Sequence, residues 1–180
     1  MIISPAHPEH LDLIEAFREE ASAWLATRGI DQWREPWPNT EAMRERIAAS
    51  IRAGQTWIVW DGPKPVASVA LDTYADPRLW TADERAEPAR YLHRLTVCRS
   101  HAGQNLGGQV LDWACNTAHH NGAKWVRIDV WTGNHRLQTY YRTHGFLPVR
   151  TIDLPDYPSG ALLQRPALPV ADTGLTQHDG

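Results

Sequence analysis

The residues best suited to chemistry begin at a glycine-rich run, Gly103-Gln104-Asn105-Leu106-Gly107-Gly108. Residues 91–98 before it carry aromatic and β-branched side chains and predict a strand. Apolar residues after it recur at three- and four-residue spacings and predict a helix from 106 to about 118. The first N–H groups of a helix lack internal partners and that end is partly positive, so the glycines would let a phosphate reach the backbone. The same glycines could instead serve only a tight strand–helix turn, and this segment alone leaves both interpretations open.

A second group of polar residues follows the next predicted strand. Residues 125–131 (WVRIDVW) alternate between apolar and polar side chains, which predicts a strand. Asn134 comes directly after it, Tyr141 follows seven residues later, and Gly145-Phe146 stands just beyond.

In this order, the strand, glycine loop, helix, second strand and the Asn, Tyr and Gly-Phe positions resemble the GCN5-related N-acetyltransferase (GNAT) family. The resemblance is carried by residues 91–146 and extends more weakly over most of the chain. Two positions depart from the usual loop pattern of the family. Ala102 stands where the family usually has Arg or Gln, and Asn105 stands at the first Gly place. Asn tolerates left-handed backbone angles, so the loop is still expected to form.

The resemblance implies a mixed α/β fold with a twisted central sheet of six to seven strands, flanked by about four helices. It implies that strands 91–98 and 125–131 splay apart and that acetyl-CoA places its pantetheine arm in the gap. The residues implied in binding the cofactor are Leu95, Val97, Ala102, Gly103, Gln104, Asn105, Leu106, Gly107, Gly108, Asn134 and Tyr141.

The activity implied by the resemblance is direct transfer of an acetyl group from acetyl-CoA to an amine. Tyr141 matches the family Tyr that protonates the sulfur of coenzyme A, and a phenol, with an unperturbed pKa of about 10, keeps its proton at neutral pH. Tyr141 could otherwise be a packing residue of an amphipathic helix. Asn134 matches a family Asn near the cofactor, and capping of the last helix accounts for it equally well.

The candidate for the general base is a histidine of strand 91–98. His93 is of the residue type that titrates near neutral pH, although a lone strand His is more often structural. Asp129 could orient an acceptor amine or pair with Arg127, and Glu35 is a weaker candidate. Leu92 is out of phase with Leu95 and Val97, which predicts a β-bulge that would turn His93 or Arg94 toward the gap.

Three tryptophans lie in the segments that usually select the acceptor in this fold. They are Trp33, Trp37 and Trp80, with acidic residues nearby. Aromatic walls and carboxylates predict a small cationic amine as substrate. The alternatives are a protein Lys or N-terminal acetyltransferase, and a non-catalytic acyl-CoA-binding sensor on the same fold.

Composition narrows the partners and the compartment. The net charge is −3 with nine His counted neutral, and the 18 basic residues are scattered, so neither nucleic acid nor a membrane surface is expected as a partner. The start of the chain lacks the pattern of a signal peptide, which favours a cytoplasmic protein. Cys98 and Cys115 have no metal-ligand or disulfide spacing and are expected to be reduced thiols. A homodimer is possible.

The rest of the chain is expected to form one domain over residues 1–166, followed by a flexible tail over 167–180. Residues 75–89, rich in charge and proline, are expected to be either a lid or a solvated excursion. The predicted elements are a first strand at 2–3, helices at 7–28 and 40–53, strands at 57–60 and 66–71, and a hairpin of 147–153 with 160–165.

Overall fold

The computed structural model describes residues 1–178, which form two compact units interleaved along the sequence. The first unit contains residues 1–71, 94–110 and the chain from 174 onward; the second contains residues 72–93 and 111–173. The chain therefore leaves and re-enters each unit, where the sequence had predicted one domain ending near residue 166.

Eight strands of the described chain follow the hydrogen-bonding order β6-β7-β5-β4-β3-β2-β1-β8. Most neighbours are antiparallel, whereas β4 pairs with β5 and β1 with β8 in parallel. The predicted mixed α/β class is confirmed. The strand count exceeds the prediction because of β8.

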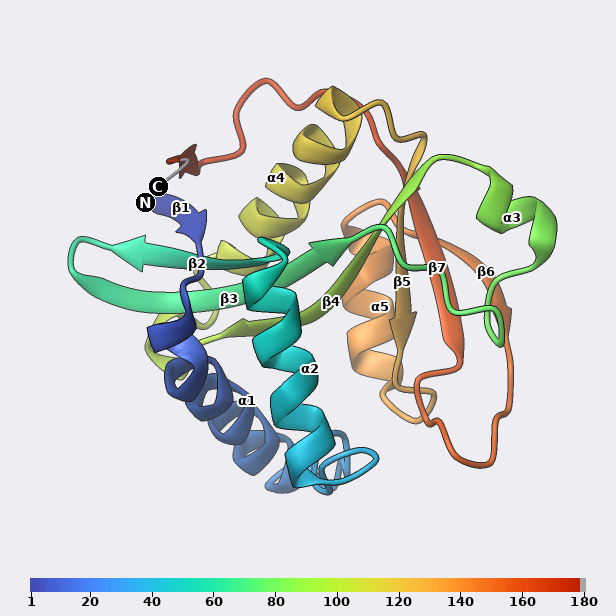
Figure 1. Cartoon of the computed structure of the whole chain (residues 1–180), viewed down its shortest axis with the longest axis horizontal. Helices are drawn as coiled ribbons and strands as arrows, with labels where there is room; N and C mark the ends of the chain where they lie inside the picture. Colours follow the sequence, from blue (N-terminus) through green and yellow to red (C-terminus); the bar gives the residue numbers. More distant parts are fainter. Residues whose placement is uncertain (179–180) are drawn as a thin grey trace. The chain divides into compact units, whose positions relative to one another are not determined.

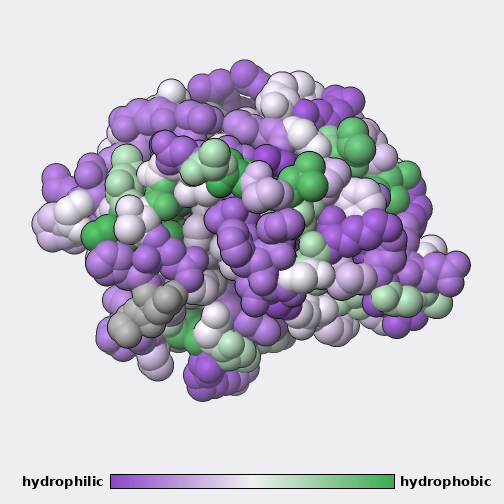
Figure 2. Space-filling model, turned by 90° about the horizontal axis from the view of Figure 1, so that it is seen from above, coloured by the Kyte–Doolittle hydropathy of each residue, from purple (hydrophilic) through white to green (hydrophobic). Residues whose placement is uncertain are grey.

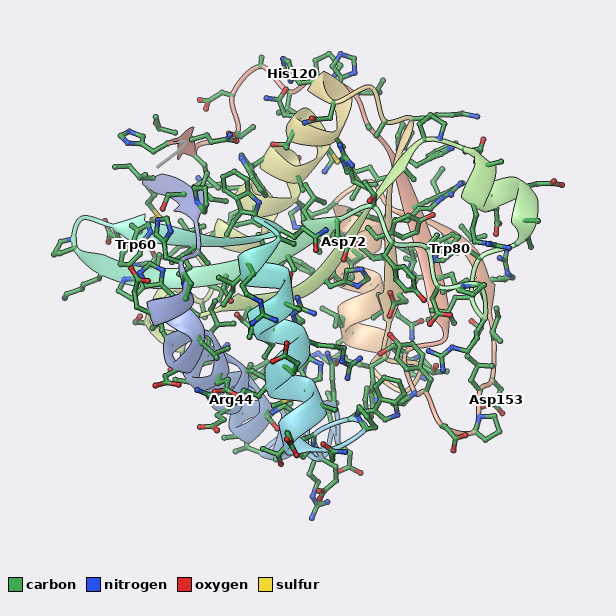
Figure 3. The ribbon with its side chains drawn as sticks, in the orientation of Figure 1. Arg44, Trp60, Asp72, Trp80, His120 and Asp153 are labelled. Atoms are coloured by element: carbon green, nitrogen blue, oxygen red, sulfur yellow. The ribbon has the colours of Figure 1, made fainter. Side chains whose placement is uncertain are left out.

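The first unit packs two helices beside its strands. Its strands are β1 (Ile2–Pro5), β2 (Thr56–Asp61), β3 (Lys64–Asp72) except for its last residue, the part of β4 (Ala89–Val97) from Arg94 onward, and β8 (Thr176–Gln177). A 3₁₀ turn at Pro8–His10 leads into α1 (Leu11–Ala26), and α2 is Thr40–Arg52. The two helices lie side by side (Figure 1), and Arg44 of α2 pairs with Asp12 and Glu15 of α1 (Figure 3). The buried core between helices and strands is Ala6, Ile14, Ile47, Ile51 and Ile58.

Sequence signals set the ends of these helices. The Asn39 side chain accepts a hydrogen bond from the Ala42 N–H at 2.9 Å, which satisfies one of the unpaired donors at the start of α2. Gly29 follows α1 with a φ of 70°, the left-handed angle that commonly ends a helix. Both signals agree with the predicted boundaries.

The predicted flexible tail contains β8, so that prediction is corrected by the structure. Thr176 donates its N–H to the Met1 carbonyl at 3.0 Å, and His178 donates to the Ile3 carbonyl at 2.9 Å. Figure 1 shows β8 beside β1. A strand of two residues has too few side chains to produce a periodic pattern, so β8 could not be predicted from the order of its residues.

The second unit is built on a hairpin and its neighbours. β6 (Leu147–Thr151) pairs with β7 (Ala161–Pro166), and β7 pairs with β5 (Trp125–Val130). The first residues of β4 (Ala89–Val97) pair in parallel with β5 over Ala89–Tyr91. The last helix is α5 (His135–Thr143), and α4 (Leu106–His120) contributes its residues from Leu111 onward.

Residues 75–89 are a packed part of the second unit rather than a lid or a solvated excursion. They contain the short helix α3 (Ala82–Ala86), which is closed by reciprocal hydrogen bonds between Thr81 and Glu84. Arg150 of β6 donates to both Glu84 carboxylate oxygens at 2.7 and 2.5 Å. The partners that fix this segment are distant in sequence, so its composition could not reveal them.

β4 contains a backbone irregularity in the region where the out-of-phase Leu92 predicted a β-bulge. Arg94 has a φ of 51°, a left-handed conformation that is uncommon for residues other than glycine. The irregularity falls immediately after His93, at the point where the chain passes from the second unit to the first.

The face in Figure 2 is covered mainly by hydrophilic residues, with hydrophobic residues in small, separate groups. No helix of residues 1–178 is long and apolar enough to cross a membrane.

Candidate active site

In the first unit, the glycine-rich run begins as an exposed loop over residues 103–105 and continues as the buried start of α4, from Leu106 to Gly108. A 3₁₀ turn at Arg99–His101 precedes it, and residues 102–105 are exposed. Gly103 has a φ of 81°, and Asn105 has a φ of 59°. The left-handed Asn105 confirms the expectation that this residue can take the place of a glycine. Its carbonyl accepts the Gln109 N–H at 3.1 Å, which opens the helix.

The loop is held from behind by polar contacts of its own unit. The Arg99 N–H donates to Glu20 at 3.2 Å, and the Arg99 guanidinium lies 4.2 Å from the centre of the Trp24 ring. The His101 Nε2 lies 3.3 Å from an Asp61 carboxylate oxygen. The N–H groups of the first turn of α4 have no partners within the helix, so this loop offers the donors that a phosphate needs.

The half of β4 that precedes the loop presents Leu95 and Val97 on one face, and both are half-buried. Thr96 between them is buried and shares a 2.8 Å hydrogen bond with Ser68. The opposite face of this strand segment is therefore fixed to β3.

In the second unit, Tyr141 lies on α5 with its ring buried. The residue is 7% exposed, and its ring packs against Phe146 and Tyr140 at centroid distances of 5.5 and 5.8 Å. Burial, followed by the charges of Tyr140 and Asp129, raises the pKa of Tyr141 well above its usual value. Among residues 1–178 its hydroxyl has no hydrogen-bond partner. The phenol thus keeps its proton, and its hydroxyl donates to no group of the described chain.

Asn134 caps α5. Its side chain accepts the Leu137 N–H at 3.0 Å, and the residue is 3% exposed. The capping role that the sequence allowed is therefore present, and a contact with the cofactor stays a prediction.

His93, near the middle of β4, lies between two carboxylates. Its Nδ1 is 3.5 Å from Asp129 Oδ1 on β5, and its Nε2 is 3.6 Å from Asp72 Oδ1 at the end of β3. Asp72 is labelled in Figure 3. The other Asp129 oxygen accepts a hydrogen bond from the Tyr157 hydroxyl at 2.6 Å. These four side chains all belong to the second unit.

A sequence model described as the Acetyltransferase (GNAT) family matches residues 14–146, well over half of the chain. The chain belongs to the GNAT family. An uncharacterized N-acetyltransferase of Bacillus subtilis (strain 168), YesJ, is 31% identical over 145 residues, which cover 79% of this chain and 79% of that protein.

Solved structures of GNAT proteins share the fold. A GNAT acetyltransferase from Listeria monocytogenes matches with a TM-score of 0.75 and 20% identity, covering 92% of this chain and 94% of the other. The PaiA N-acetyltransferase from Thermoplasma acidophilum, solved with coenzyme A, matches with a TM-score of 0.67 and 18% identity, covering 91% and 97%. Membership of this family makes the chain an acyltransferase.

The tryptophans predicted to contact the acceptor of this GNAT chain have separate environments. In the first unit, Trp33 is half-buried and its carbonyl accepts a hydrogen bond from Arg18 at 2.8 Å. Trp37 is half-buried beneath the Arg46 guanidinium, which lies 4.7 Å from its ring centre.

Trp80 lies in the core of the second unit and is corrected from an acceptor contact to a packing residue. It is 1% exposed, in a cluster with Leu79, Tyr91 and Leu162. Trp80 is labelled in Figure 3. The Arg127 guanidinium lies 5.0 Å from its ring centre. Its neighbours come from distant parts of the sequence, so its burial was not visible from the local pattern.

The expected pairing of Asp129 with Arg127 is wrong. Arg127 is fully buried and donates instead to Glu87 at 2.5 Å and to Gln164 at 3.2 Å. Asp129 is consequently available to His93 and Tyr157.

Sequence reasoning missed Asp72 and Tyr157. Asp72 is separated from His93 by the folded segment that carries α3, and Tyr157 lies in the proline-rich turn after β6. The one local signal is that Asp72, a polar residue, ends the apolar run of β3. This signal does not indicate which residue Asp72 would contact.

Proposed function

We propose that this GNAT protein transfers an acetyl group from acetyl-CoA to the amine of a small, cationic molecule. The observation that carries the proposal is the Tyr141 hydroxyl. It is attached to a buried ring, its pKa is raised by burial, and it has no hydrogen-bond partner in the described chain.

The chain's residues fit coenzyme A. In the first unit, Gly103 and Asn105 hold the loop in left-handed conformations, and the loop residues are exposed ahead of a helix of 15 residues. The residues that would hold the phosphates are Ala102, Gly103, Gln104, Asn105, Leu106, Gly107 and Gly108, and the backbone of Leu95 and Val97 would hold the pantetheine arm. When bound, acetyl-CoA supplies the activated acetyl group as a thioester.

Tyr141 is proposed to act as the general acid. Departure of coenzyme A leaves a thiolate, and a phenol that keeps its proton can donate it to the sulfur. The raised pKa of Tyr141 ensures that the proton is present over the whole neutral range.

His93 is proposed to act as the general base. An amine attacks only through its unshared electron pair, so a cationic acceptor must first lose a proton. His93 is partly exposed, with 24% of its side chain accessible, so an acceptor can reach it; Arg127 in the same unit is fully buried. The carboxylates of Asp72 and Asp129 beside it favour a positively charged acceptor.

The direct test is release of free thiol from acetyl-CoA by the purified protein in the presence of polyamines, amino acids or aminoglycosides. We expect at least one cationic amine to accelerate thiol release, with a product heavier by one acetyl group. A lysine-containing peptide library run beside the panel tests protein acceptors. If no small amine is acetylated, the proposal of a small-molecule acceptor is wrong.

A further inference from the structure

Four side chains of the second unit form a continuous polar path. Tyr157 contacts Asp129, Asp129 faces His93, and His93 faces Asp72, at 2.6, 3.5 and 3.6 Å respectively. They come from the β6–β7 loop, β5, β4 and β3. Two of the three distances exceed a hydrogen bond, so the histidine is flanked by the carboxylates without being locked by them.

The Tyr157 end of the path is rigidly built. Thr132 donates its N–H to the Pro158 carbonyl at 2.8 Å, and Gly160 donates to the Thr132 hydroxyl at 3.2 Å. A Cβ at Gly160 would lie 1.8 Å from the Ile152 carbonyl oxygen, so this close approach requires glycine.

Arg78 supports the Tyr157 ring from a second direction. Its guanidinium lies 5.3 Å from the ring centre and is held by Asp76 at 2.6 Å. The hydroxyl of Tyr157 is therefore fixed on Asp129 by contacts that involve neither His93 nor Asp72.

Asp129 divides its two oxygens between Tyr157 and His93. Asp129 Oδ2 accepts a hydrogen bond from the Tyr157 hydroxyl, and Asp129 Oδ1 faces the Nδ1 of His93. A carboxylate opposite Nδ1 favours the neutral tautomer in which Nδ1 carries the hydrogen, and Nε2 then has the unshared electron pair.

Asp72 lies next to that second nitrogen. Its Oδ1 accepts the Tyr74 N–H at 2.9 Å, which fixes the carboxylate, and the same oxygen is 3.6 Å from Nε2. A neutral imidazole has one N–H donor but here faces two carboxylates. A cation beside Asp72 would supply the missing positive partner.

We propose that Tyr157 and Asp129 position His93 with its hydrogen on Nδ1, and that Asp72 binds the ammonium group of the acceptor beside Nε2. This inference rests on the proposed acetyl transfer to a cationic amine. In the step it describes, one N–H bond of the ammonium breaks and its electron pair stays on the amine nitrogen. The proton forms a bond to Nε2, and the resulting imidazolium faces one carboxylate at each N–H. Asp129 and Tyr157 are positioning residues, and Asp72 contacts substrate.

The described residues contain no group of three His, Cys, Asp or Glu side chains arranged to hold a metal ion. The four polar side chains are not needed to anchor the β6–β7 loop, since hydrogen bonds through Thr132 and Gly160 already hold that loop.

Steady-state kinetics with the best amine of the panel separate the roles. Asp129→Asn is expected to lower kcat by about tenfold or more with little change in the KM of the amine, since general-base catalysis contributes about 10²–10⁴-fold. Asp72→Asn is expected to raise that KM by about tenfold, the effect of losing a charged hydrogen bond, with a smaller change in kcat.

Matched variants control for changes that are not specific to the path. Tyr157→Phe should lower kcat less than Asp129→Asn does. Asp156→Asn removes an exposed carboxylate from the β6–β7 loop and should leave KM unchanged. If Asp72→Asn left the KM of the amine unchanged, the ammonium-binding role would be wrong.

The second readout needs no turnover. Nitrogen-15 NMR of the full-length protein reports which ring nitrogen of His93 carries hydrogen, with His93→Gln identifying the signals. We expect the Nδ1–H tautomer in the unmodified protein and a shift toward Nε2–H in Asp129→Asn. A resting Nε2–H tautomer or imidazolium would overturn the inference. The expected tautomer in a protein that acetylates no amine would uphold the positioning of His93 and reject the proposed function.

Discussion

Two polar clusters of the second unit differ in how completely their groups are paired. The Arg127 guanidinium is fully buried and bonds Gln164, Glu87, the Tyr91 hydroxyl and the Glu84 carbonyl, with the Trp80 ring beside it. The His93 imidazole is partly exposed and faces its carboxylates at 3.5 and 3.6 Å. Tyr141, whose pKa responds to Asp129, has no hydrogen-bond partner in the described chain.

This difference in pairing distinguishes groups that stabilise the fold from groups that can react. A buried charge must be fully bonded to remain in the core, and such a group has no capacity left for a substrate. A group that accepts or donates a proton must keep one position open. We therefore assign the Arg127 cluster to the fold of residues 75–89, and we propose that the His93 cluster and Tyr141 act in catalysis.

The largest effect on stability is expected from breaking the paired cluster. Arg127→Met removes a guanidinium with four partners and takes one ion-pair partner from the Glu87 carboxylate, so the free energy of unfolding should fall by about 3 kcal/mol. Chemical denaturation measures it. Arg142→Met, on the exposed face of α5, is the control and should change it by less than about 0.5 kcal/mol. A similar small loss in Arg127→Met would remove the assignment of this cluster to stability.

The open cluster is expected to respond in turnover instead. Tyr141→Phe removes the donor but keeps the packed ring, so kcat should fall by at least about tenfold, the lower side of general-acid effects. The affinity for coenzyme A and the melting temperature should stay nearly unchanged. Tyr140→Phe changes the half-buried neighbour and should keep full turnover. Equal rates in the two variants would refute the general-acid role.

In the first unit, the loop at residues 102–105 depends on its backbone conformation rather than on paired side chains. Gly103→Val introduces a β-branched residue at a φ of 81° and should weaken coenzyme A binding by about tenfold, because left-handed strain of about 1–2 kcal/mol displaces the loop. Gly122→Val imposes similar strain at a φ of 73°, also with open space around the Cβ. Calorimetric titration should show weaker binding in Gly103→Val alone; equal binding in both would argue against the phosphate loop.

The smallest effect concerns the carboxylate that anchors α3. Hydrogen bonds from Arg150 lower the pKa of Glu84 to about 2, so its ionised form stabilises the fold at neutral pH. That contribution is complete above the unfolded pKa of about 4.3 and is lost as the pH falls toward 2. Glu84→Gln should cost about 1 kcal/mol at pH 7, and the difference from the unmodified protein should vanish near pH 2. A difference that stayed constant with pH would contradict this linkage.

The sequence predicted those features of the structure that depend on residues close together in the chain. The left-handed Asn105 and the irregular backbone at Arg94 each depend on neighbours a few residues away. Asp72 and Tyr157 could not be predicted, because only the folded sheet and the β6–β7 loop bring them to His93 and Asp129. Trp80 was misassigned for the same reason, since its burial depends on β4 and β7.

The most direct test of the central claim, an acetyl-CoA-dependent transferase, is calorimetric titration of the purified protein with acetyl-CoA and, separately, with coenzyme A. We predict micromolar binding of both, despite Ala102 and Asn105 at positions where the family usually has other residues. Absence of binding at millimolar concentrations of either molecule would contradict the proposed function.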